Sequence, residues 1–329
     1  MAPRTRASLA GLAAISAIVL GLSADASAQS YPAKPIHIVV PFAPGGITDI
    51  LARALGQRLT ETWNQQVVIE NKPGANSQTG AEYVAKVAPD GYTLLVSADT
   101  TFVMNPHLYS KLGYDPVKDF APVSGLGISP QALVVHPSVP AQNLKELIEL
   151  AKKKPGEINY GTFGAGSSGH LNIELLQTLT GAKFTAVHYK GASPAINDVL
   201  GNHIQMVIVS IGLVAQHWQA GKLRVLGFGS TARLPQYPDV PTLAESGLPG
   251  YEAASWYGLA APKATPREIV DKLSAETQRI FADPAFRDRF LAPNFIYSIA
   301  GPPESFARRI DVDLVKWGKV IRDANVKVE

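Results

Sequence analysis

Two glycine-rich segments of this sequence combine residue types that could bind an anion. Residues 36–49 read IHIVVPFAPGGITD, and residues 158–170 read INYGTFGAGSSGH. Each segment has the pattern of a short strand, a glycine-rich turn and the start of a helix. Glycine lets backbone N–H groups approach a ligand closely, and a helix N-terminus carries roughly half a positive charge. We therefore expect two anion-binding loops that hold one ligand from opposite sides of a cleft.

The polar residues of the first segment can be interpreted in two ways. Thr48 and Asp49 stand where the N-cap of the following helix is expected, so both could serve only to cap that helix. Alternatively they line the cleft, where a buried Asp49 would repel an anion. In that case Asp49 would order water molecules or pair with an ammonium group of the ligand.

The second segment matches a cofactor-binding motif in spacing but not in context. Gly164, Gly166 and Gly169 have the spacing of the dinucleotide fingerprint. However, the next predicted strand ends in HYK at residues 188–190, without the acidic residue that binds a ribose hydroxyl. The seven histidines show no metal-binding spacing and the chain has no cysteine. We therefore expect neither a cofactor nor a metal site.

An enzymatic alternative rests on Ser167. A serine on a strand-to-helix turn resembles the nucleophile of a serine hydrolase, which needs a histidine and an acid nearby. His170, His188, His203 and Asp198 are the candidate partners. An exported serine hydrolase thus stays open as the second hypothesis, and it requires a nucleophile and a base within about 3 Å of each other.

The N-terminus has the features of an export signal. Arg4 and Arg6 precede a predominantly apolar run at residues 9–22, and Ala26-Ser27-Ala28 forms a cleavage motif. The run is shorter than the roughly 20 residues that a membrane span requires. We expect residues 1–28 to be removed, leaving Gln29 first in a periplasmic protein. The formal net charge of +3 gives no electrostatic indication of nucleic-acid binding.

Strands and helices alternate through the rest of the chain, which predicts an α/β fold. A βαβαβ unit is predicted from strands 36–41, 67–70 and 92–97 with helices 48–62 and 77–87. A second unit combines strands 158–161, 185–188, 204–209 and 223–228 with helices 170–180, 194–200 and 213–220. The chain would cross between two lobes near residues 123–128 and again near 256–260. These crossings would leave helices 266–282 and 303–323 on the first lobe. Trp256, on the return crossing, is a candidate for the cleft floor. The predicted lobes are 29–125 with 255–329, and 126–254; a simple tandem of two domains is the alternative.

Several further motifs carry a family resemblance. They are YPAKPI at 31–36, PFAPGGITD at 41–49, VIENKPG at 68–74, PDGYTLL at 89–95, NPHLY at 105–109, YDPVKDFAPV at 114–123, YKG at 189–191, residues 234–242 and GLPG at 247–250. In this order and spacing, the chain resembles the solute-binding receptors of tripartite tricarboxylate transporters, called Bug receptors. The resemblance covers essentially the whole chain after residue 28.

This resemblance implies a type II periplasmic binding protein fold, with two lobes of mainly parallel sheets and a ligand cleft between them. It implies a monomeric, non-enzymatic receptor that binds a small organic carboxylate, a dicarboxylate or an aromatic carboxylate, and passes it to membrane components of a transporter. The ligand-binding residues that it implies are Phe42, Ala43, Gly46, Thr48 and Asp49 from the first loop, and Thr162, Ala165, Gly166, Ser167 and His170 from the second. Ser97, Thr100 and Ser210 are candidates for the variable part of the pocket.

Overall fold

The computed structural model describes residues 31–323 and residue 326. The predicted signal peptide, residues 1–28, and the predicted mature terminus at Gln29 lie outside these residues. Within the described part of the chain, no helix has the length and apolar character needed to cross a membrane.

A first set of parallel strands comes from the N-terminal part of the chain. The strands β1 (Ile36–Val40), β2 (Val67–Asn71) and β3 (Thr93–Ala98) pair in the order β2-β1-β3. They are joined by the helices α2 (Ile47–Trp63) and α3 (Gln78–Lys86). Leu51, Leu55 and Leu59 of α2 are fully buried, because apolar residues three or four positions apart share one helix face. Parallel pairing brings the loops that follow β1 and β3 to one edge of the sheet.

A second parallel set has the order β7-β5-β6. Its strands are β5 (Asn159–Thr162), β6 (Thr185–His188) and β7 (Met206–Ser210), with the helices α5 (Leu144–Lys153), α6 (Ser168–Thr180), α7 (Ala192–Leu200) and α8 (Ala215–Gln219) around them. Alternate residues of β7 enter two hydrophobic clusters: Met206 and Ile208 one, Val207 and Val209 the other. This alternation shows that both faces of the strand are covered.

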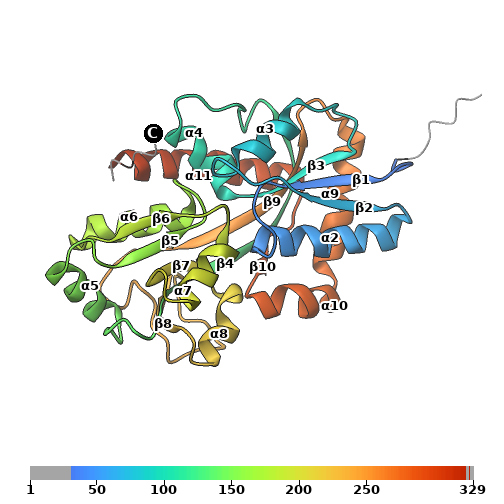
Figure 1. Cartoon of the computed structure of the whole chain (residues 1–329). Helices are drawn as coiled ribbons and strands as arrows, with labels where there is room; N and C mark the ends of the chain where they lie inside the picture. Colours follow the sequence, from blue (N-terminus) through green and yellow to red (C-terminus); the bar gives the residue numbers. More distant parts are fainter. Residues whose placement is uncertain (1–30, 324–325, 327–329) are drawn as a thin grey trace, which may run out of the picture. The chain divides into compact units, whose positions relative to one another are not determined.

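Two long strands join the parallel sets. β4 (Phe120–Val135) and β9 (Ala254–Pro262) run antiparallel to each other across the molecule (Figure 1). β9 also pairs with β3 and β4 also pairs with β7, giving the order β2-β1-β3-β9-β4-β7-β5-β6. The predicted crossings therefore lie within β4 and β9, and antiparallel pairing there makes the complete sheet mixed. The strands β8 (Arg224–Phe228) and β10 (Tyr297–Ser298) pair with β4 as well.

The C-terminal helices pack on elements of the first parallel set. α9 (Arg267–Ala282) contacts α2 and β4, whereas α11 (Pro303–Asp323) contacts β4 and the π-helix η2 (Thr100–Met104) that follows β3. Phe306 of α11 lies edge-on to Phe102 and Trp256 in the core. The shorter elements are α4 (Asn105–Leu108), α10 (Pro284–Phe286), η3 (Ile211–Leu213), η4 (Arg287–Leu291) and η5 (Ala292–Asn294).

Candidate ligand-binding site

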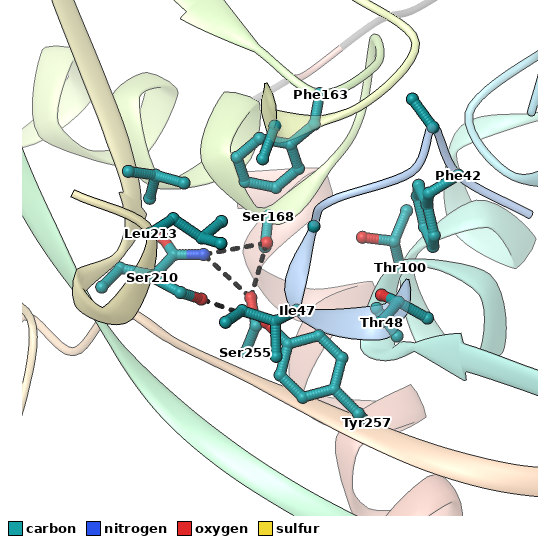
Figure 2. A pocket seen from close by; sticks show the side chains of 16 residues that line it. Phe42, Ile47, Thr48, Thr100, Phe163, Ser168, Ser210, Leu213, Ser255 and Tyr257 are labelled. Carbon is teal, nitrogen blue, oxygen red and sulfur yellow. Dashed lines mark hydrogen bonds between the residues drawn. The ribbon is translucent and has the colours of Figure 1, made fainter. Parts of the chain in front are cut away.

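A cavity opens where the loop after β1 and the end of β3 face the start of α6 and the end of β7 (Figure 2). About 470 Å³ of atom-free space lies between the lining residues, part of it open to solvent. The lining residues are Phe42, Ala43, Gly46, Ile47, Thr48, Ala98, Thr100, Gln131, Phe163, Ser168, Ala192, Val209, Ser210, Leu213, Ser255 and Tyr257.

The predicted site residues divide into two groups. Six of the predicted residues line the cavity: Phe42, Ala43, Gly46, Thr48, Thr100 and Ser210. The other predicted residues, Asp49, Ser97, Thr162, Ala165, Gly166, Ser167 and His170, lie outside its lining. The division follows from how each loop uses its own polar groups.

The first loop presents bare backbone to the cavity. Gly46 is the N-cap of α2, and no side chain caps this helix end. The first N–H groups of a helix have no intrahelical acceptor, so those of Ile47 and Thr48 are available at the cavity wall. Gly45 adopts φ +85°, and a Cβ there would lie 3.0 Å from Ser193 Oγ, which explains the glycine. Neither Thr48 nor Asp49 is the N-cap, so that part of the sequence interpretation is wrong.

Asp49 holds the first loop together from its inner side. Its carboxylate accepts hydrogen bonds from Gly45 N at 3.0 Å, Arg53 Nε at 2.9 Å and Asn71 Nδ2 at 2.9 Å. Burial alone would raise the pKa of Asp49, but the hydrogen bonds from Arg53, Gly45 and Asn71 outweigh it and lower the pKa below its ordinary value. Asp49 is therefore a compensated anion that fixes the loop's conformation.

The second loop uses most of its polar groups internally. Thr162 Oγ1 donates to Gly164 O at 3.1 Å and also contacts His188 Nδ1 at 2.8 Å. Ser167 is the N-cap of α6, where its hydroxyl accepts a hydrogen bond from His170 N at 3.4 Å. The next residue along, Ser168, is the one whose hydroxyl reaches the cavity.

The surroundings of Ser167 lack the geometry of a serine hydrolase. His170 Nδ1 accepts a hydrogen bond from Gly166 N at 2.9 Å, and His170 Nε2 faces Glu174 Oε1 at 3.6 Å. Both ring nitrogens of His170 are thus engaged without Ser167. Among the hydrogen bonds of the described residues, none joins the Ser167 hydroxyl to a histidine ring, so the general base that this alternative requires is not in place.

The cavity floor is a cluster of hydroxyl and amide groups, of which the sequence analysis named only Ser210. Gln131 Nε2 donates to Ser168 Oγ at 3.1 Å and to Ser255 Oγ at 2.8 Å, and the two serine oxygens lie 2.8 Å apart. Tyr257 contacts Ser210 through their hydroxyls, 3.1 Å apart (Figure 2). Gln131 belongs to β4, and Ser255 and Tyr257 belong to β9. The floor is therefore built on the two strands that join the parallel sets.

Trp256 does not floor the cleft. Successive side chains of a strand point to opposite faces, so Trp256 turns away from the cavity that its two neighbours line. Its ring stacks on Phe102 at 5.9 Å in the core of the first parallel set. The prediction identified the correct strand but the wrong residue.

One uncompensated carboxyl group lies behind the cavity wall. Asp99 follows β3 and is 1% exposed, between the lining residues Ala98 and Thr100. It accepts hydrogen bonds from Thr100 N at 2.7 Å and Trp256 N at 3.4 Å. Burial raises the pKa of Asp99 to about 7, and the hydrogen bonds only partly counter it. Near neutral pH, Asp99 therefore exchanges between its protonated and its ionised form.

The geometry agrees with a match to a known family. The family described as "Tripartite tricarboxylate transporter family receptor" matches residues 51–326. The chain belongs to this receptor family. Protein BugT of Bordetella pertussis is 36% identical over 310 residues, which are 94% of this chain and 95% of BugT. The family resemblance drawn from the sequence motifs is confirmed.

Solved structures of similar receptors confirm the expected fold class, the type II periplasmic binding protein fold. The structure of R. palustris Rpa4515 with adipate has a TM-score of 0.87 and 35% identity, covering 90% of this chain and 99% of that chain. MatC from Rhodopseudomonas palustris with bound malate has a TM-score of 0.84 and 32% identity, covering 88% of this chain and 100% of that chain. Both of these similar proteins contain an organic carboxylate in the structures described.

Proposed function

We propose that this receptor captures a small organic carboxylate in the cavity between its glycine-rich loops and delivers it to the membrane components of a tripartite tricarboxylate transporter. The observation that carries the proposal is the donor set: free N–H groups at the start of α2 and the Ser168 hydroxyl at the start of α6 face one cavity. None of the lining residues is acidic. The adipate and malate of the similar receptors agree with this chemistry.

In this proposal the carboxylate lies against the first loop. The N–H groups of Ile47 and Thr48 and the Thr48 hydroxyl supply hydrogen bonds, while the helix dipole of α2 supplies electrostatic stabilisation. Ser168 approaches from the second loop. Phe42 and Phe163 form apolar walls around the body of the ligand.

Closure of two lobes would complete the site. We propose that residues 29–125 with 255–329 rotate against residues 126–254 when the cleft opens and closes. Direct hydrogen bonds that link the two parts at the cavity rim are expected of the closed form. Ala43 N donates to Lys190 O at 3.1 Å, and Ser193 Oγ donates to Pro44 O at 3.2 Å. Ligand contacts made from both sides only in the closed form would shift the population toward it.

The decisive experiment combines a thermal-shift screen of aliphatic dicarboxylates, aromatic carboxylates and acidic amino acids with calorimetry on two variants at one position. Gly46→Asp adds a negative charge at the anion contact and should abolish binding. Gly46→Ala is the control, because Gly46 has φ −80° and a Cβ there would meet no atom within 4 Å. At a ligand concentration 100 times the dissociation constant, the free energy of unfolding of the wild-type protein should rise by about 2.7 kcal/mol. That of the Gly46→Asp variant should not change. Equal affinity of both variants would remove the first loop from the site.

Export is tested separately. Mature protein recovered from a Gram-negative periplasm should be monomeric and begin at or near Gln29, which intact-mass spectrometry measures. An intact Met1 terminus on the recovered protein would contradict the proposed periplasmic location.

A further inference from the structure

The imidazole ring of His170 holds the second glycine-rich loop against the start of α6. His170 is 7% exposed, and its Nδ1 accepts a hydrogen bond from Gly166 N at 2.9 Å. Gly166 adopts φ +79°, which places it in a tight turn that favours glycine. Ser167 N closes the same turn by donating to Gly164 O at 3.0 Å. The ring of His170 therefore fixes the middle of this turn from its buried side.

The contact with Gly166 determines which nitrogen of the His170 ring carries a proton. A backbone N–H group can only donate, so Nδ1 must be unprotonated to accept from it. In the neutral ring the proton then lies on Nε2, which faces Glu174 Oε1 at 3.6 Å. A doubly protonated ring would place an N–H group against the N–H group of Gly166. The geometry of the loop therefore requires the neutral form of His170.

The titratable groups around His170 come from α6, β5, β6 and the segment between α6 and β6. Glu174 of α6 accepts a hydrogen bond from Tyr160 Oη of β5 at 2.8 Å. Burial alone would raise the pKa of Glu174, but the hydrogen bonds from His170 and Tyr160, with the charge of Lys183, outweigh it and lower the pKa. His188 of β6 lies edge-on to His170 at 5.1 Å, and burial together with His170 lowers the pKa of His188. The ring of His170 thus lies between an ionised carboxylate and a second, uncharged imidazole.

The loop fixed in this way supplies groups to the cavity and to a contact between the two proposed lobes. Phe163 and Ser168 stand at its two ends, and both line the cavity (Figure 2). The Phe163 ring packs on the start of α6, since a Cβ on Gly169 would lie 2.6 Å from it. Between them, Ala165 O accepts a hydrogen bond from the hydroxyl of Tyr109, the residue after α4, at 3.0 Å. A change in the turn would therefore displace two lining residues and a hydrogen bond between the lobes together.

We propose that His170 is a positioning residue for the second glycine-rich loop, and that tight carboxylate binding requires its neutral form with the proton on Nε2. Protonation of His170 breaks the hydrogen bond from Gly166 N, releases the turn and lowers the affinity of the cavity for a carboxylate. Because imidazoles titrate between about pH 5 and pH 8, the affinity falls as the pH is lowered through this range. The inference rests on the proposed function, because it concerns the affinity of the same cavity.

The test compares the wild type with two variants by isothermal titration calorimetry at pH 7.5 and pH 5.5. His170→Asn places an amide oxygen where Nδ1 stands, so the acceptor for Gly166 N is kept without a titrating group. His170→Leu keeps a branched side chain but offers no acceptor. The probes are the C4 to C8 alkanedioates, malate, benzoate and glutamate, and the probe that binds the wild type most tightly is used for all proteins. The ratio of the affinities of wild type and His170→Asn at each pH cancels protonation of the probe itself.

The two variants should separate at neutral pH and converge with the wild type at different pH values. At pH 7.5, His170→Leu should bind about tenfold more weakly than the wild type, because a buried N–H group loses its acceptor, whereas His170→Asn should stay within about threefold. Between pH 7.5 and pH 5.5, the wild type should lose about five- to tenfold in affinity relative to His170→Asn. Circular dichroism at both pH values checks that all the proteins are folded.

Two further measurements assign the effect to this imidazole. In protein labelled with ¹⁵N-histidine at pH 7.5, long-range ¹H–¹⁵N spectra should show His170 with a protonated Nε2 and a bare Nδ1. The absence of its signals from the spectrum of His170→Asn assigns them. His188→Asn is the matched control, because it removes the neighbouring imidazole, whose Nδ1 contacts Thr162 Oγ1 at 2.8 Å. This variant should keep the loss of affinity at pH 5.5.

The outcomes separate this inference from the proposed function. An affinity that falls equally in the wild type and in His170→Asn would overturn the inference and leave a carboxylate receptor standing. Unchanged affinity of His170→Leu, a proton on Nδ1 of neutral His170, or a pH dependence that disappears in His188→Asn would overturn it as well. Binding of none of the probes by folded wild-type protein would overturn the proposed function, and this inference with it.

Discussion

Two buried aspartates at the same edge of the sheet differ in how their charge is balanced. Asp49 follows β1 and receives three hydrogen bonds, one of them from the cationic Arg53. Asp99 follows β3, receives hydrogen bonds from Thr100 and from the backbone of Trp256, and has the acidic Asp313 nearby. The pKa of Asp49 lies below its ordinary value, whereas burial raises that of Asp99 to about 7.

This difference separates two uses of a buried carboxyl group. The compensated Asp49 fixes the loop that presents N–H groups to the cavity, and its charge is part of the folded structure. The charge of Asp99 costs stability because burial is not offset by a cation. Asp99 therefore contributes a negative potential behind the cavity wall at alkaline pH and little at acidic pH.

The largest effect is expected for Asp99→Asn. The folded protein keeps a proton on Asp99 from pH 4 to about pH 7, where the unfolded chain has already released it, so this group makes the free energy of unfolding fall as pH rises through that window. Between pH 5 and pH 8 the wild type should lose about 3 kcal/mol relative to the variant. Urea denaturation at both pH values measures this difference.

Asparagine preserves the acceptor for Thr100 N and Trp256 N, so the variant tests charge rather than shape. A difference between wild type and variant that is the same at pH 5 and pH 8 would show that Asp99 does not titrate in this range. It would also remove the contrast with Asp49.

Asp49→Asn should have an effect on stability opposite in sign to that of Asp99→Asn, because it should destabilise the folded protein. One carboxylate oxygen of Asp49 accepts from Gly45 N and Arg53 Nε, and the other accepts from Asn71 Nδ2. Asparagine keeps only one of these two acceptors and places an amide nitrogen, which cannot accept, against the other donors, so the variant should be destabilised by about 1–3 kcal/mol at pH 7. Because the folded pKa lies below its usual value, this stabilisation is present above pH 4 and is lost only as the pH falls through the folded pKa. Denaturation curves should therefore show a constant deficit from pH 5 to pH 8.

Arg53→Gln is the control for this second prediction. The Asp49 side chain is buried but the Arg53 side chain is 53% exposed, so solvent screens the charge that Arg53 brings to this pair. The loss should therefore be smaller than for Asp49→Asn, which affects three donors. A larger loss for Arg53→Gln would mean that the ion pair, and not the loop network, is what Asp49 supplies.

Local sequence signals predicted the elements that position the site. Helix 48–62 was expected and α2 spans Ile47–Trp63, because apolar residues that recur three and four positions apart predict a helix. The two crossings were also expected, at 123–128 and 256–260, and lie within β4 and β9. These features depend on residues that are close together in the sequence.

The side-chain assignments within the site depended on contacts that sequence does not reveal. Ser167 and Ser168 are neighbours of the same type, but the first caps α6 and the second reaches the cavity. Ser255, Trp256 and Tyr257 are all buried, because β9 is covered on both faces. A strand buried on both sides gives no alternation that distinguishes a cavity face from a core face. Gln131 and Ser255 could thus be recognised only once β4 and β9 were placed beside α6.

The smallest expected effect comes from Asp313→Asn, which alters the environment of Asp99 without touching its hydrogen bonds. Asp313 Oδ2 accepts a hydrogen bond from Trp256 Nε1 at 2.6 Å, and the asparagine oxygen can still accept it. Removing this like charge should move the midpoint of the pH-dependent stability loss below that of the wild type, because Asp313 is one of the groups that raise the pKa of Asp99. Burial is the larger cause, so the shift should be modest, and Asp99→Asn combined with Asp313→Asn should show no such midpoint at all. Denaturation curves collected in half-unit steps from pH 5 to pH 8 give the free energy of unfolding against pH for both variants.

If Asp313→Asn leaves the pH midpoint of the stability loss unmoved, the raised pKa of Asp99 is due to burial alone. If the pH-dependent loss persists in the double variant, it belongs to another group.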